Sequence, residues 1–232
     1  MITLKNAEKK YNGNVVLAID NLTFQRGEIV GVVGNNGAGK TTMFSAILDL
    51  IQLSDGYIEN NQQRVNQSEE WKKYTSSYLD EKFLIDYLTP DEYFNLVGSL
   101  KGYSSEDVQE FISGFRAFFN GEIDNKRKYI RNLSKGNQQK IGIVASLIGN
   151  PQIVLLDEPF SNLDPTSQYR LRQIINDFQQ QNNCTFLISS HDLNHVAEVC
   201  SRIVILEKGK VVDDVKTSDE TMMRLESYFA IF

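Results

Sequence analysis

Two kinds of hydrophobic pattern divide this chain. Residues 2–33 combine short apolar runs with the turn signals Asn12-Gly13-Asn14 and Arg26-Gly27, which predicts strands joined by tight turns. From residue 134 onward, segments with helical periodicity alternate with short apolar runs. This alternation predicts a mainly parallel sheet with helices on both faces. The expected helices are 135–148, 165–181 and 192–199, and the expected strands are 153–157, 184–189 and 203–207, with a last hairpin from Lys208-Gly209 into Val211-Val212.

The apolar run at residues 29–33 predicts a buried strand, and the apolar positions that follow suit a helix over 41–51. Turn residues and polar residues then separate further elements. These are a turn at Asp55-Gly56, a strand at 57–59, an exposed polar connection over 60–70 and a strand at 74–79.

Residues 82–132 predict a helical insert without strands. Thr89-Pro90-Asp91-Glu92 is a capping box with proline at the first helical position, and Ser104 or Ser105 caps a second helix. The large apolar residues at helical spacing favour core packing, and an exposed groove for a partner helix is the alternative. They are Tyr93, Phe94, Leu96, Val97 and Leu100, then Val108, Phe111, Ile112, Phe115, Phe118 and Phe119; a short terminal helix is also expected over Met222–Phe232.

Length and composition are sufficient for one large domain or for one domain with a subdomain. The chain has 232 residues, of which 41% are hydrophobic. It carries 24 basic and 30 acidic residues, a net charge of −6, which argues against nonspecific binding of nucleic acid. We therefore expect no nucleic-acid partner.

Neither the cysteines nor the apolar segments indicate export or membrane insertion. Cys184 and Cys200 form no C-x-x-C motif and are expected to be buried thiols in a reducing compartment. The N-terminus lacks the apolar core of a signal peptide, and no stretch approaches the roughly 18–20 apolar residues that span a bilayer. We expect a soluble chain or one that another protein attaches to a membrane.

Residues 34–42 match the pattern G-x-x-x-x-G-K-[ST] between an expected strand and an expected helix. Glycines let backbone N–H groups turn inward around phosphate oxygens, and the helix N-terminus adds unpaired donors. Lys40 supplies a positive charge for the β- and γ-phosphates, and the Thr41 hydroxyl suits Mg²⁺. We expect a nucleotide site rather than a glycine-rich turn without a ligand. Its residues are Gly34, Asn35, Asn36, Gly37, Ala38, Gly39, Lys40, Thr41 and Thr42.

Two carboxylates follow a second apolar run. Residues 153–156 are continuously apolar and precede Asp157-Glu158-Pro159. The carboxyl end of a buried strand faces the ligand crevice of an α/β sheet, so both acids are expected there rather than in a solvated turn. Asp157 is suited to hold Mg²⁺ through water, and Glu158 to orient or deprotonate an attacking water.

With these motifs in this order, the chain resembles the nucleotide-binding subunit of an ABC (ATP-binding cassette) transporter over essentially all its residues. The corresponding segments are Tyr11 for the aromatic residue that stacks on adenine, 34–42 for the Walker A loop, 153–157 for the Walker B strand, Leu133 to Gln139 for the signature sequence, Ser161 to Asp164 for the D-loop and His191 for the switch histidine.

The resemblance implies an α/β P-loop NTPase fold: a single ABC ATPase domain over 1–232. Its core with an N-terminal antiparallel β subdomain comprises 1–81 and 133–232, and its helical subdomain comprises 82–132. It also implies ATP and Mg²⁺ as ligands. Two cassettes, either two copies or two different chains, then close head-to-tail around two nucleotides, and Ser134 and Gly136 of one contact the ATP of the other.

Several of these residues also have a purely structural interpretation. His191 is expected to hydrogen-bond the γ-phosphate or the attacking water, whereas His195 is expected to be a surface or capping residue. Asp164 contacts nucleotide by resemblance but also suits the N-cap of the helix that begins at Pro165. Base stacking is expected for Tyr11, with hairpin packing as the alternative.

The sequence departs from the family pattern in two places, the signature sequence and the position after the strand 74–79. The signature sequence has Lys135 and Asn137 where the commonest form has Gly and Gln, a variant that resembles a subset of prokaryotic-type exporters. The position that is usually a glutamine after the strand 74–79 aligns with Glu81, which is expected to reach Mg²⁺ or its water.

The resemblance therefore predicts an ATPase that powers an ABC exporter. Separate transmembrane permease subunits are its expected partners, because the chain has no span of its own, and these would place it in the cytoplasm on the inner face of the cell membrane. The alternative is a soluble ABC-type ATPase that acts on nucleic acid or ribosomes, although the coiled-coil arms, zinc cysteines and tandem cassettes typical of those relatives are missing from the sequence. A small-molecule kinase is a third hypothesis, against which the signature sequence and the Asp-Glu pair argue.

Overall fold

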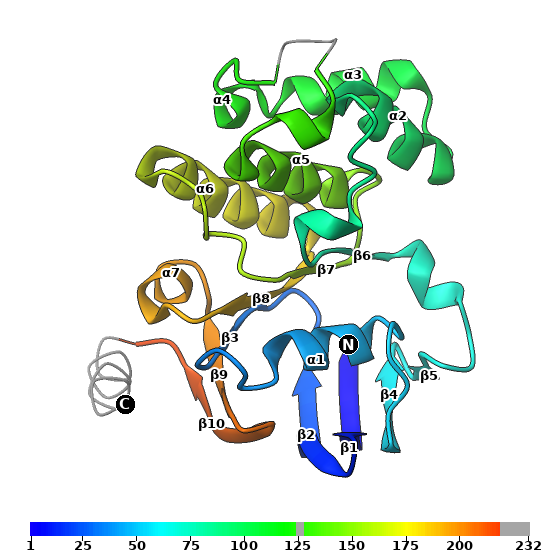
Figure 1. The fold of residues 1–232 in the computed structure, drawn as a ribbon, viewed down its shortest axis with the longest axis vertical. Coiled ribbons are helices and arrows are strands. Elements are labelled where there is room, and N and C mark those ends of the chain that lie inside the picture. Colours follow the sequence, from blue (N-terminus) through cyan, green and yellow to red (C-terminus); the bar gives the residue numbers. More distant parts are fainter. Residues whose placement is uncertain (124–127, 219–232) are drawn as a thin grey trace.

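The computed structural model describes residues 1–123 and 128–218, so the expected terminal helix at 222–232 lies outside the described residues. Two sheets lie on one side of the molecule and helices α2–α6 gather on the other (Figure 1). This mixed α/β architecture confirms the predicted fold class. The strands are β1 (Ile2–Tyr11), β2 (Asn14–Phe24), β3 (Ile29–Val33), β4 (Asp55–Asn60), β5 (Gln63–Arg64), β6 (Thr75–Tyr78), β7 (Ile153–Leu156), β8 (Thr185–Ser190), β9 (Arg202–Glu207) and β10 (Lys210–Lys216).

The six-stranded sheet has the order β10-β9-β3-β8-β7-β6, and only the β9–β10 hairpin is antiparallel. Strands β3, β8 and β7 are buried at every position because both faces of the sheet are covered. In β7, Val154 and Leu156 pack in the core beside the large helices, whereas Ile153 and Leu155 pack in the core shared with α1 and the other sheet. The period of two along the strand thus serves two separate cores.

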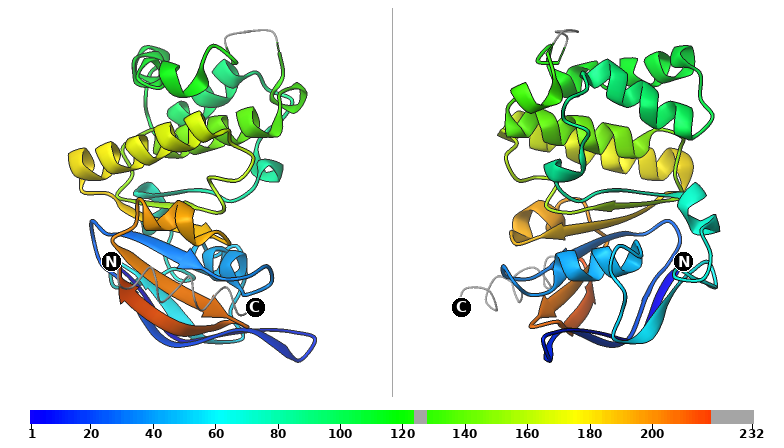
Figure 2. Two further views of the ribbon diagram at one scale, coloured as in Figure 1. Left: turned by 90° about the vertical axis from the view of Figure 1, so that its left-hand side faces the viewer. Right: turned by 45° about the vertical axis from the view of Figure 1, so that its right-hand side comes forward.

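The four-stranded sheet has the order β2-β1-β4-β5, in which every pair is antiparallel. Asn12 and Gly13 form the turn between β1 and β2, as the sequence predicts, and both have positive φ angles. The apolar face of this sheet packs on α1 through residues such as Leu4 and Phe24. Figure 2 shows α1 between the two sheets.

The described helical residues between β6 and β7 form one layer beside the six-stranded sheet (Figures 1 and 2). Thr89 forms the capping box that the sequence predicts. Of the two serines expected to cap the second helix, Ser104 is the N-cap, and it also forms a capping box with Asp107. Phe94, Phe118 and Phe119 are buried, whereas Phe111 and Phe115 are half-buried against the same core. The helices are α1 (Lys40–Ile47), α2 (Pro90–Leu100), α3 (Ser105–Ser113), α4 (Arg116–Phe119), α5 (Lys135–Leu147), α6 (Pro165–Asn182) and α7 (Leu193–Ala197), with 3₁₀ turns η1 (Glu70–Lys73), η2 (Glu81–Phe83) and η3 (Ile130–Asn132).

Three expectations differ from the structure. Helix α1 ends at Ile47 instead of residue 51, because Asp49 adopts a left-handed conformation with a φ of 53°. Helix α7 is five residues long, shorter than the expected 192–199. The connection over 60–70 is not wholly irregular: β5 pairs with β4, and Val65 is buried there.

Both cysteines are free and buried, as expected. Burial raises the pKa of the Cys184 thiol to about 12, so this group stays protonated at neutral pH. Within the described residues, no helix is both long enough and apolar enough to cross a bilayer.

Candidate functional site

The loop between β3 and α1 forms the cavity in which the sequence predicts a phosphate. Gly39, the N-cap of α1, has a φ of 107°, and Gly37 has a φ of 82°, so the loop uses glycine where other residues would be strained. A Cβ atom added to Gly34 would lie 2.2 Å from the carbonyl oxygen of Leu206, so only glycine fits there as well. These constraints curl the backbone around the N-terminus of α1.

This loop lines a cavity of about 370 Å³, which is large enough for a triphosphate group. Glu158 and Val16 approach it from other parts of the chain. The residues that line it are Val16, Asn36, Gly37, Ala38, Gly39, Lys40, Thr41, Thr42 and Glu158. The cavity therefore brings together most of the expected Walker A residues and the expected base.

Lys40 is buried under the loop. Its Nζ donates to the carbonyl oxygen of Gly34 at 2.7 Å and lies 3.4 Å from Glu158 Oε1. The side chain is therefore extended along the loop, where a triphosphate would replace or share these partners. A buried ammonium beside backbone N–H groups makes this cavity suitable for an anion.

Thr41 and Asp157 form a group of oxygen atoms beside Lys40. Thr41 Oγ1 donates to Asp157 Oδ2 at 2.6 Å, and the hydroxyl of Ser189 donates to Asp157 Oδ1. Burial is the main cause that raises the pKa of Asp157, and its two hydroxyl donors oppose this rise. A carboxylate and a hydroxyl in contact are the oxygen ligands that Mg²⁺ prefers, so these residues fit that ion.

Glu158 follows β7 with a φ of 48°, an unusual conformation for a residue with a large side chain. Its amide donates to the Ser189 hydroxyl at 2.9 Å, and Gln139 Nε2 donates to its carbonyl oxygen at 3.3 Å. Glu158 Oε2 lies 2.8 Å from His191 Nδ1. Contacts on three sides thus hold the strained backbone and aim the carboxylate at Lys40 and His191.

Three other expected nucleotide residues lie around the start of α5 and α6. The hydroxyl of Ser134 accepts from the Asn137 amide at 3.3 Å and caps α5. Gly136 lies so close to the D-loop that an added Cβ would be 2.6 Å from the carbonyl oxygen of Asn162. Asp164 caps α6 by accepting from Ser167, and these hydrogen bonds lower the pKa of its carboxyl. The structural role of Asp164 as an N-cap is therefore present.

Ser134, Gly136 and Asp164 do not line the cavity at the Walker A loop. Tyr11 does not line it either: its side chain is 47% exposed, and Lys9 Nζ lies 4.7 Å from its ring centroid. An exposed ring at the end of β1 leaves a face available to a base.

Glu81 forms an ion pair in this structure. Its Oε1 lies 2.8 Å from Lys135 Nζ, and this hydrogen bond is the main cause that lowers the pKa of Glu81. Glu81 does not line the Walker A cavity, and it is not hydrogen-bonded to Thr41 or Asp157. Among the described residues there is also no group of three or more acidic, histidine or cysteine side chains suited to a metal.

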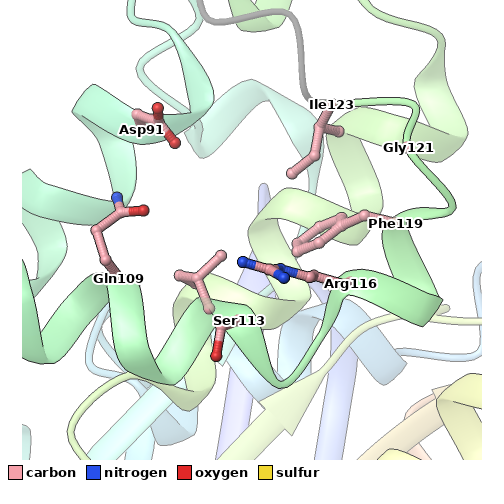
Figure 3. Close-up of a pocket in the computed structure, with 8 residues that line it drawn as sticks. Asp91, Gln109, Ser113, Arg116, Phe119, Gly121 and Ile123 are labelled. Carbon is pink, nitrogen blue, oxygen red and sulfur yellow. The ribbon is translucent and has the colours of Figure 1, made fainter.

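Two further cavities lie outside this site. One of about 330 Å³ follows β6 and η2 to α2 and α5, and Phe83 stands 65% exposed beside it. Another of about 480 Å³ lies between α2, α3 and α4, where Asp91, Arg116 and Ile123 direct their side chains into it (Figure 3). None of the predicted nucleotide residues lines either of them.

The sequence analysis missed two residues of the site. Ser189 contacts Asp157 and Glu158 from the end of the neighbouring strand β8, and Gln139 contacts the carbonyl oxygens of Glu158 and Pro159 from α5. A signal for Ser189 existed, because it ends an apolar run two residues before His191. Gln139 ends the signature segment, but nothing in the sequence indicates its contact with Glu158, because that contact depends on how α5 lies over the sheet.

A β3–loop–α1 anion site next to a strand that ends in Asp157-Glu158 defines a P-loop nucleoside triphosphatase. The chain belongs to the ABC transporter family, whose model, described as "ABC transporter", matches residues 17–161. It is an ATP-binding subunit of that family, with ATPase activity.

Relatives and solved structures agree with this membership. An uncharacterized ABC transporter ATP-binding protein of Methanocaldococcus jannaschii is 37% identical over 221 residues, which is 94% of this chain and 78% of the relative. A methionine import ATP-binding protein of Carboxydothermus hydrogenoformans is 29% identical over 94% of this chain and 67% of its own length. The dimeric post-hydrolysis structure of an ATP-binding cassette bound to ADP and Pi is similar with a TM-score of 0.84 and 26% identity, over 94% of this chain and 99% of that one.

Proposed function

We propose that this chain powers an ABC exporter by hydrolysing ATP with Glu158 as general base. The observation that carries this proposal is the position of Glu158, which lies 3.4 Å from Lys40 and 2.8 Å from His191 at the cavity of the Walker A loop. A carboxylate between a phosphate-binding lysine and a histidine is suited to orient and deprotonate an attacking water. His191 then hydrogen-bonds the γ-phosphate or that water.

Each remaining residue of the cavity has a proposed role in binding ATP. Backbone N–H groups of the Walker A loop hold the phosphates, and Lys40 exchanges its contact with Gly34 for phosphate oxygens. Thr41 and Asp157 would hold Mg²⁺, which supplies positive charge next to the β- and γ-phosphates. Glu81 as a further contact to that ion remains a prediction, and Tyr11 is proposed to stack on adenine.

Closure of two cassettes completes the proposed site. Ser134, Gly136 and Asp164 lie away from the Walker A cavity, so a second cassette is needed for them to reach a nucleotide. Ser134 immediately precedes α5, and Gly136 lies in its first turn. The amide groups at this helix N-terminus favour an anion. This arrangement supports head-to-tail closure in which loss of the γ-phosphate releases the two halves.

The proposed partners are separate permease subunits in the membrane. The cavity between β6 and α2, with Phe83, Tyr93 and Val97 beside it, offers apolar surface for a helix of such a subunit. This would hold the chain at the inner face of the cell membrane. The proposed direction, export, rests on the signature variant with Lys135, whereas one relative is named as a methionine import protein.

Purification of the tagged chain from detergent extracts of its own cells tests this proposal. A co-purifying protein with several membrane spans is expected, and inside-out vesicles that contain both should take up substrate only with ATP. Recovery of ribosomes or nucleic acid in its place would contradict the transporter role and favour the alternative of a soluble ABC-type ATPase. Uptake into right-side-out vesicles would agree with the transporter role but would show that the direction is import rather than export.

A further inference from the structure

Two of the three residues that depart from the family pattern, Glu81 and Lys135, form an ion pair with each other. Glu81, in η2, and Lys135, at the first position of α5, are 54 residues apart in the sequence, and their Oε1 and Nζ atoms lie 2.8 Å apart. The Lys135 side chain is 71% exposed, and the Glu81 side chain 29%. Each charge thus compensates the other at a point where the common family pattern has neither.

This ion pair joins the strand beside Asp157 to the start of α5. The Asp157 amide donates to the carbonyl oxygen of Tyr78 at 2.9 Å, and Glu81 follows Tyr78 by three residues. Lys135 immediately follows Ser134, the N-cap of α5. A short series of covalent bonds and polar contacts, which includes this ion pair, therefore connects Asp157 to Ser134.

A second contact lies two turns along the same face of α5. Gly142, seven residues after Lys135, is so close to Tyr78 that an added Cβ would lie 2.2 Å from its ring. On another side of the helix, Gln139 holds the Glu158-Pro159 turn. The ion pair therefore adds a contact from the β6–η2 segment to the first turn of α5, ahead of the Tyr78–Gly142 contact.

We propose that Glu81 and Lys135 are positioning residues that hold Ser134 at a fixed offset from the nucleotide site of the same chain. This inference rests on the proposed role of Ser134 in closure. In a head-to-tail pair, Ser134 of each copy must meet the nucleotide of the other while both Walker A loops are occupied. Both Ser134–nucleotide contacts can form at the same time only if the distance between Ser134 and the Walker A loop stays constant within each chain.

A charge-exchange experiment on the full chain tests this role. The variants are Glu81→Lys, Lys135→Glu and the double variant with both changes, and kcat and KM for ATP hydrolysis are measured for each. An exposed ion pair contributes little to the free energy of unfolding, so all three are expected to fold normally. Glu70→Lys is the matched control, because it breaks the exposed Glu70–Lys73 ion pair away from the site with the same change in charge.

Each single variant is expected to lower kcat about five-fold, the scale of one surface ion pair, with KM for ATP unchanged because the Walker A contacts remain. The double variant is expected to regain most of the lost kcat, and high salt should lower the wild-type kcat toward that of the single variants. The control should retain wild-type values.

Three results would overturn the proposal. Wild-type kcat in both single variants would show that the pair positions nothing. Inactivity of Glu81→Lys and of the double variant would assign Glu81 to the nucleotide or its metal. Loss in Lys135→Glu without recovery in the double variant would assign Lys135 a direct contact with phosphate. These kinetic measurements use the isolated ATPase. They therefore test the role of the ion pair whether the chain powers an exporter or an importer.

Discussion

His191 Nδ1 lies 2.8 Å from Glu158 Oε2, and the backbone amide of His191 also donates to this oxygen at 3.3 Å. The two residues follow neighbouring parallel strands, β7 and β8, whose carboxyl ends meet at one edge of the sheet. The contact therefore arises from strand order rather than from closeness in sequence. It leaves Glu158 Oε1 directed toward Lys40.

Replacement of Glu158 by glutamine should separate binding from hydrolysis. The amide has nearly the shape of the carboxylate but cannot accept a proton, so kcat should fall by about 10²–10⁴-fold while ATP still binds. Gel filtration with ATP should then detect a stable dimer. Hydrolysis at the wild-type rate would show that another group acts as the base.

The two histidines provide a matched comparison. His191→Ala should lower kcat by about 10²-fold with little change in ATP affinity, because its side chain contacts Glu158 rather than the loop. His195→Ala should keep kcat within about two-fold, since that ring packs against Phe160 with centroids 5.4 Å apart and is not part of the site. Steady-state kinetics on both variants test this comparison. An equal loss of kcat in the two variants would indicate a shared structural effect.

Lys40→Ala should weaken ATP binding. Removal of a charged hydrogen-bond donor costs about 1.5–3 kcal/mol, which corresponds to about a 10- to 150-fold rise in Kd. Titration with a fluorescent ATP analogue measures this change. Lys72→Ala, in the exposed pair with Glu69, is the control and should bind as the wild type does. An unchanged Kd in Lys40→Ala would mean that the triphosphate lies elsewhere.

Changes at Ser134 should block closure but not binding by the monomer. Ser134→Arg adds bulk, and Ser134→Asp keeps an N-cap for α5 while it repels phosphate. In a Glu158→Gln background, both should abolish the ATP-dependent dimer. Ser105→Arg, at an exposed position of α3, should leave the dimer intact. Dimers of normal size from the two Ser134 variants would exclude the serine from the interface.

Gly142→Ala should destabilise the fold. Alanine favours a helix over glycine by about 1 kcal/mol, but its Cβ would lie 2.2 Å from the buried Tyr78 ring. Overpacking of this kind costs about 1–3 kcal/mol, so we expect a net loss and a midpoint of thermal unfolding that falls by about 2–4 °C per kcal/mol. Gly114→Ala is the control, because its Cβ would lie 3.4 Å from the carbonyl oxygen of Phe111, an ordinary contact distance. A midpoint as high as that of wild type would disprove the close packing.

Features that depend on neighbouring residues could be predicted from the amino-acid sequence. The Walker A loop, the Thr89 capping box and the Asn12-Gly13 turn are each set by local backbone preferences and hydrogen bonds within a few residues. The continuous apolar run of β7 likewise predicts a strand that is buried on both faces. The family resemblance followed from these motifs and their order.

The contacts between distant side chains, in contrast, follow from the three-dimensional fold. The order β9-β3-β8-β7-β6 brings Ser189 to Asp157 and His191 to Glu158, and the position of α5 over the sheet brings Gln139 to Glu158 and Lys135 to Glu81. The partners in these pairs are separated by 19 to 54 residues. Local preferences carry no information about such pairs, because strand order and helix packing result from burial of apolar surface over the whole domain.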